Sequence, residues 1–177
     1  MNLEKMLHNF KKESFRLESK KIYKIKGEWE LFQKYKRGEN IKEIPNEKEF
    51  RKLIENDVKK GKSHIRVRVI PKLINDYIKF EIKFAYIKQI RIGHKIYVIN
   101  ESDFKKILTK RFTQEDFYLF DNAIVVRIIY NKEGEFLGTS LIDNVKEVYQ
   151  YKLLKEKLLK EAIPLTLWLK ENSLFDE

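Results

Sequence analysis

The sequence DFYLFDNAIVVRIIY, at residues 116–130, decides the fold class of this chain. Its two halves, residues 116–121 and 123–130, are rich in β-branched and aromatic side chains, and a tight turn at Asp121-Asn122 separates them. This pattern is typical of two antiparallel strands joined by a short loop. A third run of the same kind follows at residues 136–142. We therefore predict an antiparallel meander in this part of the chain.

Turn and cap residues indicate how this meander continues. Gly134 lies in a polar stretch that predicts a second turn, and Gly138 falls inside the third run, where a glycine indicates a β-bulge. Asp143 or Asn144 is then suited to cap a long amphipathic helix. The meander is therefore expected to end in a helix that covers the sheet.

Two further strands are predicted toward the amino terminus, at residues 64–70 and 95–99. In the first of them, alternation with a period of two places Arg66 and Arg68 on one face. The opposite face carries Ile65, Val67 and Val69. This strand therefore has one charged face and one apolar face.

Apolar residues recur at helical spacing in the segments between these strands. We expect helices over residues 2–16, 29–35, 74–85 and 145–159, with Gly38 closing the second of these. Two further helices are expected, one from Asn46 to Gly61 and one from Asn100 or Ser102 to Leu108. A last helical turn is expected to run through Trp168. Residues 74–85 also allow a strand, and we favour the helix. Asn46 and Glu49 have the spacing of a capping box.

These elements predict a single three-layer α/β domain over residues 1–177, with a mixed sheet flanked by helices on both faces. It opens with an amphipathic helix, and residues 172–177 are expected to fray. Neither a repeat nor a low-complexity linker divides the chain.

The composition excludes several classes of chemistry. The chain has no cysteine, so thiolate metal sites and cysteine nucleophiles are excluded, and its three histidines are a thin basis for a metalloenzyme. The six glycines form neither a dinucleotide fingerprint nor a phosphate loop, and no serine lies in a nucleophile elbow. We therefore predict no metal, no cofactor and no catalytic residue. Since a long apolar run and a signal-like amino terminus are both missing, we expect a cytoplasmic protein that does not enter a membrane.

The net charge of +11 is unevenly distributed. Residues 1–63 carry 18 basic and 11 acidic side chains, residues 64–111 carry 12 and 4, and residues 112–177 carry 8 and 12. A basic surface of this kind attracts the phosphates of nucleic acids. The alternative is compositional, because 30 of the 38 basic residues are lysine, a bias that an A/T-rich genome or a hot habitat also produces.

One group of residues carries the candidate site. Arg66 and Arg68 share a strand face, and the helix that follows presents Tyr77 and Glu81. Two guanidinium groups beside a phenol and a carboxylate are suited to bind a phosphate or a carboxylate. The alternative is an internal ion pair between an arginine and Glu81 that holds the helix on the strand.

Asp116 and Asp121 are further polar residues that could contribute to a site. They flank the run 117–120, and their odd spacing sends them to opposite faces of a strand. That geometry is poor for a shared metal or an acid–base pair, and the alternative role for both is to cap turns.

Several short motifs, in a fixed order, extend over nearly the whole chain. They are Phe15-Arg16-Leu17-Glu18 with Tyr23, the segment 32–39, Arg66-Val67-Arg68-Val69, Asn75-Asp76-Tyr77, Phe80-Glu81, Gly93 with Ile96, the segment 116–121, the segment 134–138, and Ala162 with Pro164. In these motifs the chain resembles a family of small actinobacterial proteins that are described only as a domain of unknown function and are often encoded beside helix-turn-helix regulators. The chain departs from that family in its lysine content and its amino-terminal helix.

This resemblance implies a mixed α/β domain that works with a transcription regulator. The final strands and helix are also similar to phospholipase-D-like domains that lack the catalytic motif, a likeness of fold alone. Our leading hypothesis is a non-enzymatic regulatory or binding module that contacts nucleic acid or a DNA-bound helix-turn-helix regulator through its basic surface. The alternative is an enzyme acting on a small molecule or a phosphodiester, in which Arg66 and Arg68 hold an anion and Glu81 or Asp116 transfers a proton. A third possibility, a structural or oligomerisation protein, rests only on the aromatic stripe of Trp29, Phe32 and Tyr35.

Overall fold

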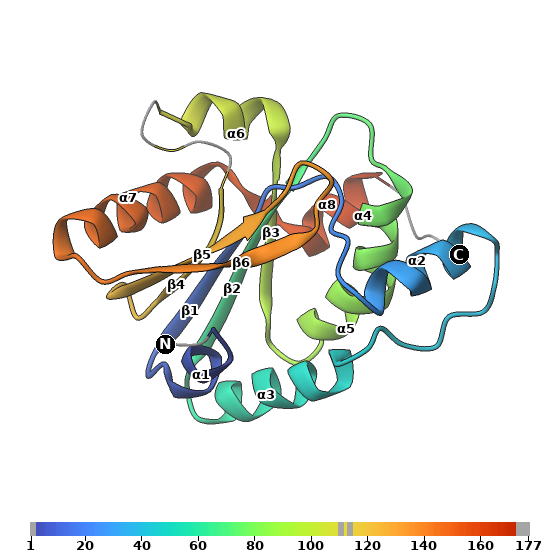
Figure 1. The fold of residues 1–177 in the computed structure, drawn as a ribbon, viewed down its shortest axis with the longest axis horizontal. Coiled ribbons are helices and arrows are strands. Elements are labelled where there is room, and N and C mark those ends of the chain that lie inside the picture. The colour runs from blue at the N-terminus through green and yellow to red at the C-terminus, as the bar shows by residue number, and fades with distance from the viewer. Residues whose placement is uncertain (1–2, 110–111, 113–114, 173–177) are drawn as a thin grey trace.

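A mixed seven-stranded sheet forms the centre of the protein in a computed structural model that describes residues 3–109, 112 and 115–172 (Figure 1). The strand order is β6-β5-β4-β1-β2-β3-β7. The strands are β1 (Glu13–Glu18), β2 (Ser63–Ile70), β3 (Lys95–Asn100), β4 (Asp116–Phe120), β5 (Ile124–Tyr130), β6 (Phe136–Ile142) and β7 (Ile163–Pro164). Strands β1, β2 and β3 run parallel, and antiparallel strands extend the sheet at both sides.

Helices cover both faces of this sheet (Figure 1). They are α1 (Leu3–Asn9), α2 (Glu28–Lys36), α3 (Glu47–Lys59), α4 (Asp76–Glu81), the π-helical turn η1 (Ile82–Tyr86), α5 (Ile87–Ile90), α6 (Glu101–Ile107), α7 (Val145–Glu161) and α8 (Leu165–Asn172). The side chains of α6 and α7 pack on one face, and those of α1, α2, α4, η1 and α8 pack on the other. The predicted α/β domain with a mixed sheet between helices is confirmed.

The predicted meander is present as β4, β5 and β6, which pair in sequence order. The tight turn between β4 and β5 places both Asp121 and Asn122 at positive φ. A register shift opposite Ile129 and Tyr130 leaves Leu137 out of the pairing, next to Gly138, which confirms the predicted bulge. The side chain of Asn144 accepts hydrogen bonds from two backbone N–H groups of α7, as expected of a helix cap.

The prediction of one helix over residues 2–16 is wrong. Helix α1 ends at Asn9, and the chain then forms β1. Phe10 and Phe15, which both fall within the predicted helix, are instead buried on opposite faces of the sheet. The alternation of Ser14, Arg16 and Glu18 with apolar residues has the period of a strand, and β1 pairs with β2 on one side and β4 on the other.

Other details of the helix ends and the tail also differ from expectation. Asn46 precedes α3 in a left-handed conformation, with φ of 62°, and its side chain makes no capping hydrogen bond, so the predicted capping box with Glu49 does not form. The two-residue strand β7 was not predicted, because so short an edge strand has no periodicity of its own. Of the tail expected to fray, Asn172 ends α8, and residues 173–177 lie outside the described residues.

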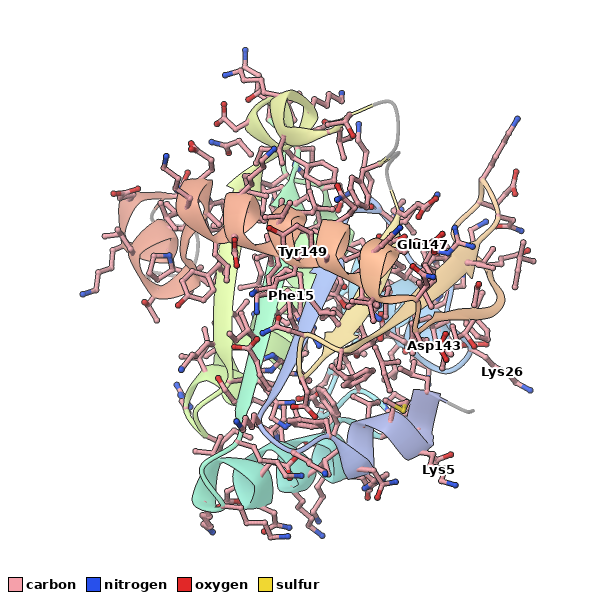
Figure 2. All side chains as sticks on the ribbon, turned by 90° about the vertical axis from the view of Figure 1, so that its left-hand side faces the viewer. Lys5, Phe15, Lys26, Asp143, Glu147 and Tyr149 are labelled. Atoms are coloured by element: carbon pink, nitrogen blue, oxygen red, sulfur yellow. The ribbon has the colours of Figure 1, made fainter. Side chains whose placement is uncertain are left out.

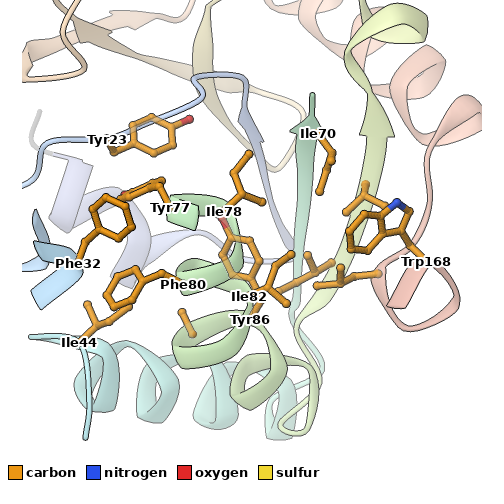
Figure 3. Packing of buried hydrophobic residues seen from close by; sticks show 14 of the residues in the cluster. Tyr23, Phe32, Ile44, Ile70, Tyr77, Ile78, Phe80, Ile82, Tyr86 and Trp168 are labelled. Carbon is orange, nitrogen blue, oxygen red and sulfur yellow. The ribbon is translucent and has the colours of Figure 1, made fainter. Parts of the chain in front are cut away.

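Two apolar clusters hold the layers together. On one face, Phe15 of β1 lies under α7 and packs with Leu154 and Leu158 (Figure 2). On the other face, aromatic and branched side chains of α2, α4 and η1 pack against Ile70 and Trp168 (Figure 3). The charged residues of β1 and β2 lie beside this second cluster, so the site described next is set into the helical side of the sheet.

Candidate functional site

A row of charged side chains crosses the centre of the sheet on the face that carries α4 and η1. Arg16 of β1 is paired in register with Arg66 of β2, and Glu18 is paired with Arg68. All four residues are buried. Because strands alternate, the residues between them point to the opposite face and pack under α7.

A cleft of about 910 Å³ opens above this row. Its walls come from α1, the loop that follows β1, the first turn of α3, η1 and the hairpin of β5 and β6. Its polar lining includes Arg16, Glu18, Glu28, Glu47, Arg66, Glu81, Tyr86, Gln89, Tyr118 and Tyr130. Leu3, Leu7, Ile25 and Phe136 add apolar surface. The volume is that of a small-molecule site.

Glu18 is the acceptor that joins the two paired arginines. Its carboxylate accepts a hydrogen bond from Arg16 Nε at 3.0 Å and one from the Tyr86 hydroxyl at 2.7 Å, and it lies 3.3 Å from Arg66 Nη1. Burial alone would raise the pKa of Glu18, but the charges of Arg66, Arg16 and Arg68 lower it to about 2. Glu18 is therefore a permanent anion beneath the cleft.

Arg66 is the least occupied of the buried arginines. Its ion pair with Glu18 spans 3.3 Å, and its Nε atom has no hydrogen-bond partner among the described residues. The guanidinium carbon lies 4.9 Å from the centre of the Tyr86 ring. Burial opposes its charge, but Glu18 and the nearby phenols raise the pKa of Arg66. The guanidinium group is therefore held by Glu18 and Tyr86, while its Nε–H donor has no acceptor among the described residues.

Arg16 is more fully occupied than Arg66. Besides Glu18, it donates from Nη2 to the Tyr130 hydroxyl at 3.4 Å, and its guanidinium carbon lies 4.5 Å from the centre of the Tyr118 ring. The difference between the two paired arginines therefore lies in their neighbours rather than in their depth.

The structure places the four residues of the predicted site in two different settings. Arg66 and Glu81 line the cleft, whereas Arg68 is fully buried and donates to Glu81 Oε2 from Nε at 3.2 Å and from Nη2 at 2.8 Å. Arg68 also donates to the carbonyl oxygens of Glu18 and Lys20. Tyr77 is fully buried, and its hydroxyl donates to Glu28. Arg68 and Glu81 thus form the internal ion pair that the sequence offered as the alternative.

The π-helical turn η1 brings Glu81 and Tyr86 together. In such a turn, residues five apart lie in line, and the Tyr86 hydroxyl is 3.2 Å from Glu81 Oε1. This hydroxyl has one proton and lies between Glu18 and Glu81, so both contacts are hydrogen bonds only when Glu81 itself carries a proton. Burial raises the pKa of Glu81 to about 7, against the opposing charge of Arg68. Glu81 therefore takes up a proton as the pH falls through about 7, while Glu18 stays ionised.

Asp116 and Asp121 do not enter the cleft. Asp116 is buried and accepts hydrogen bonds from the backbone and hydroxyl of Ser19 and from the Tyr23 hydroxyl. Asp121 accepts from the backbone N–H groups of Lys11, Lys12 and Glu13. Both carboxylates fix the segments that enter and leave β1.

A second buried polar network lies at the other end of the charged row. His64 Nδ1 is 3.0 Å from Ser14 Oγ, and its Nε2 is 2.9 Å from Asp57 Oδ2. Burial lowers the pKa of His64, so its ring is neutral and links the hydroxyl to the carboxylate. Neither Ser14 nor His64 lines the cleft, and both are almost fully buried, so this array gives no access to a substrate.

Of the polar residues that line the cleft, the sequence reasoning proposed only Arg66 and Glu81 as site residues. Arg16 and Glu18 were missed because β1 was assigned in part to a helix, although their alternation with Phe15 and Leu17 was visible. Tyr86 was missed because a π-helical turn leaves no clear mark in a sequence.

The described residues show neither a metal cluster nor a membrane span. Within residues 3–109, 112 and 115–172, no group of three or more histidine or acidic side chains could hold a metal ion. In the same part of the chain, no helix is long and apolar enough to cross a membrane.

Comparison with known proteins gives a family. No curated protein matches the chain. The sequence model of the family described as Domain of unknown function (DUF6879) matches residues 1–170. Because this match spans nearly the whole chain and includes every residue of the cleft, the protein belongs to the family of that domain.

Proposed function

We propose that this protein is a binding module for a small molecule whose anionic group docks on Arg66 in the cleft above β1 and β2. The observation that carries this proposal is the unused Nε donor of a guanidinium that is only 7 % exposed. A buried donor without a partner costs about 1–3 kcal/mol, so such groups are rare and call for a reason. The unused donor indicates that the folded chain does not saturate this guanidinium, and the part of Arg66 that lines the cleft is open to a ligand anion.

The surroundings of Arg66 support this role. The cleft volume of about 910 Å³ lies within the range of small-molecule sites, and its apolar surface suits the body of an organic ligand. The neighbouring arginines are already committed, Arg16 to Glu18 and Tyr130 and Arg68 to Glu81. Arg66 is thus the buried cation that a ligand can engage without breaking a hydrogen bond of the fold, and the half-buried Lys24 and the exposed Lys26 also line the cleft.

The test follows the Arg66 Nε–H resonance in proton–nitrogen correlation spectra during titration with inorganic phosphate and with phenylpropionate. We expect a saturable shift of this resonance with phenylpropionate, and loss of binding in Arg66→Gln. Arg37→Gln is the matched control, because Arg37 pairs with Glu39 at an exposed position outside the cleft. Absence of a shift with both anions, or equal binding by Arg66→Gln, would overturn the proposal.

Charge supports a second candidate, contact with nucleic acid or with a DNA-bound regulator. The excess of basic residues lies in residues 1–111, and many of these lysines are exposed, such as Lys5 and Lys26 (Figure 2). On the outer side of α3, however, exposed lysines alternate with Glu49 and Glu55, which weakens the local field. We therefore rank this candidate below ligand binding.

A salt titration tests the second candidate. Binding of a labelled random duplex should weaken by orders of magnitude between about 50 and 200 mM salt if several phosphates are contacted. It should also weaken when exposed lysines of α3, such as Lys52 and Lys59, are replaced by glutamine. Failure to bind at the lower salt concentration would remove this candidate. Turnover of a phosphodiester, with Glu81 as the proton-transferring group, stays a prediction of the sequence.

A further inference from the structure

The cleft is lined by a guanidinium group and by two carboxyl groups that form no ion pair with it. Arg66 lies on its floor, and Glu28 of α2 and Glu47 of α3 lie on its walls. The Arg66 charge acts on both carboxyl groups, yet no ion pair of 4.0 Å or less joins them among the described residues. Both carboxyl groups therefore line the cleft without a described cation at ion-pair distance.

Both wall carboxyl groups are held by neutral donors alone. Glu28 accepts from the Tyr77 hydroxyl, and Glu47 accepts from Gln89 Nε2 at 3.2 and 3.0 Å. Burial raises the pKa of both groups, and the hydrogen bonds oppose this rise only in part. A cation bound beside either carboxylate would relieve the cost of desolvation that it bears.

Glu81 is excluded from this role. Its carboxyl group is already engaged by Arg68 and Tyr86. Of the remaining charged positions, Arg66 supplies the buried cation, Glu28 and Glu47 supply carboxyl groups that no described ion pair engages, and Lys24, Lys26 and Glu135 are half-buried or exposed. We refer to Arg66 as the basic pole of the cleft and to Glu28 and Glu47 as its acidic pole. Apolar side chains of α1 and β6 also line the cleft.

We propose that the ligand is an α-amino acid or a close analogue with an apolar side chain, its carboxylate on Arg66 and its ammonium group between Glu28 and Glu47. This inference rests on the proposed function and deepens it, because it names the class of ligand. A purely anionic ligand would satisfy Arg66 and leave the buried Glu47 and the half-buried Glu28 without a cation. A zwitterion satisfies both poles with charge-assisted hydrogen bonds.

Three probes of similar size test this inference in the full chain. They are phenylpropionate, which has only the anion, phenylethylamine, which has only the cation, and L-phenylalanine, which has both. We expect L-phenylalanine to bind about tenfold more tightly than phenylpropionate, as one added charge-assisted hydrogen bond predicts. Phenylethylamine should leave the Arg66 Nε–H resonance unshifted.

Single substitutions test whether Glu47 and Glu28 hold the ammonium group of the ligand. Glu47→Gln should remove the preference for L-phenylalanine over phenylpropionate while leaving the binding of phenylpropionate intact. Glu49→Gln is the matched control, since Glu49 is exposed two residues along the same helix and does not line the cleft. Glu28→Gln provides a second variant of the acidic pole, should Glu47→Gln not fold.

The outcomes separate this inference from the proposal beneath it. If phenylpropionate binds at Arg66 but L-phenylalanine binds no more tightly, the zwitterion is overturned and the anion site stands. If neither phenylpropionate nor phosphate shifts the Arg66 resonance, the proposed function fails and this inference fails with it. If the preference for L-phenylalanine survives in both glutamate variants, the assignment of the acidic pole is overturned.

Discussion

Arg16 on β1 and Arg66 on β2 occupy directly paired positions on adjacent parallel strands, so two buried guanidinium groups stand side by side in the sheet. Like charges on neighbouring strands repel, and desolvation adds to the cost. The carboxylate of Glu18 offsets this cost, because it contacts both arginines. The stability of the charged row therefore depends on one acceptor.

Replacing Glu18 with glutamine should strongly destabilise the fold. The neutral amide cannot compensate two buried cations, and removal of one partner from a buried ion pair costs about 3–5 kcal/mol. Urea denaturation measures the change in the free energy of unfolding. Glu39→Gln is the control, since Glu39 pairs with Arg37 at an exposed position, and we expect a change within about 0.5 kcal/mol. A similar small loss for both variants would mean that Glu18 does not hold the row together.

Gly134 should tolerate no side chain. It has φ of 87°, and an added Cβ would lie 2.5 Å from the carbonyl oxygen of Ile22. Its own carbonyl accepts a hydrogen bond from Lys24 N–H, so this turn holds the loop that forms a rim of the cleft. We expect Gly134→Ala to lower the free energy of unfolding by about 2–3 kcal/mol, because strain and displaced backbone add.

Gly38→Ala is the matched control for this prediction. Gly38 also has positive φ, of 75°, but an added Cβ would have no neighbour within 4 Å. Its cost should be that of the backbone conformation alone, about 1 kcal/mol. Equal losses in thermal or urea denaturation of the two variants would show that the approach of Ile22 does not constrain Gly134.

Local periodicity predicted the meander and the two faces of β2 but not the site as a whole. The alternation of Arg66 and Arg68 with apolar residues depends only on neighbours in the sequence, so it could be read directly. The contact that gives Arg66 its role comes from Glu18, nearly 50 residues away, and sequence spacing carries no information on such a pairing. Central strands usually have apolar residues on both faces. Strand β1 instead carries two charged residues on one face, a pattern that is typical of a segment at the protein surface.

The buried histidines predict how stability depends on pH. Burial lowers the pKa of His94 well below its usual 6.5, and the charge of Arg66 lowers it further, as does His64 when it is protonated. The unfolded chain binds a proton as the pH falls below about 6.5, while the folded protein resists protonation. The stabilising effect of His94 is therefore complete above about pH 6.5 and is lost as the pH falls toward its lowered pKa.

Replacing His94 with glutamine should flatten this dependence. Between about pH 6 and pH 5, the free energy of unfolding of the wild-type protein should fall by up to about 1.4 kcal/mol per pH unit more steeply than that of His94→Gln. His8→Gln should keep the wild-type slope, since His8 is exposed on α1. Denaturation curves at several pH values measure both slopes. An unchanged slope in His94→Gln would contradict the assignment.

The two arginines of β2 should differ in what they contribute to stability. Arg68 is 0 % exposed and donates to Glu81 and to two backbone carbonyl oxygens, so Arg68→Gln leaves a buried carboxyl group and two acceptors unpaired. We expect a loss of about 3–5 kcal/mol. In Arg66→Gln, Glu18 keeps its contacts with Arg16 and Tyr86, and an unused donor is removed. We expect a loss below about 1 kcal/mol, since functional groups often add little to stability.

Paired measurement of stability and binding makes this contrast decisive. Arg66→Gln should remain folded in urea denaturation and lose the binding of phenylpropionate, because the cleft keeps its walls and lacks only its cation. A loss for Arg66→Gln as large as that for Arg68→Gln would make Arg66 a structural residue, and the argument from its unused donor would fail. Arg66 and Arg68, which lie on one face of β2, would then both belong to an ion-pair network that stabilises the fold and binds no ligand.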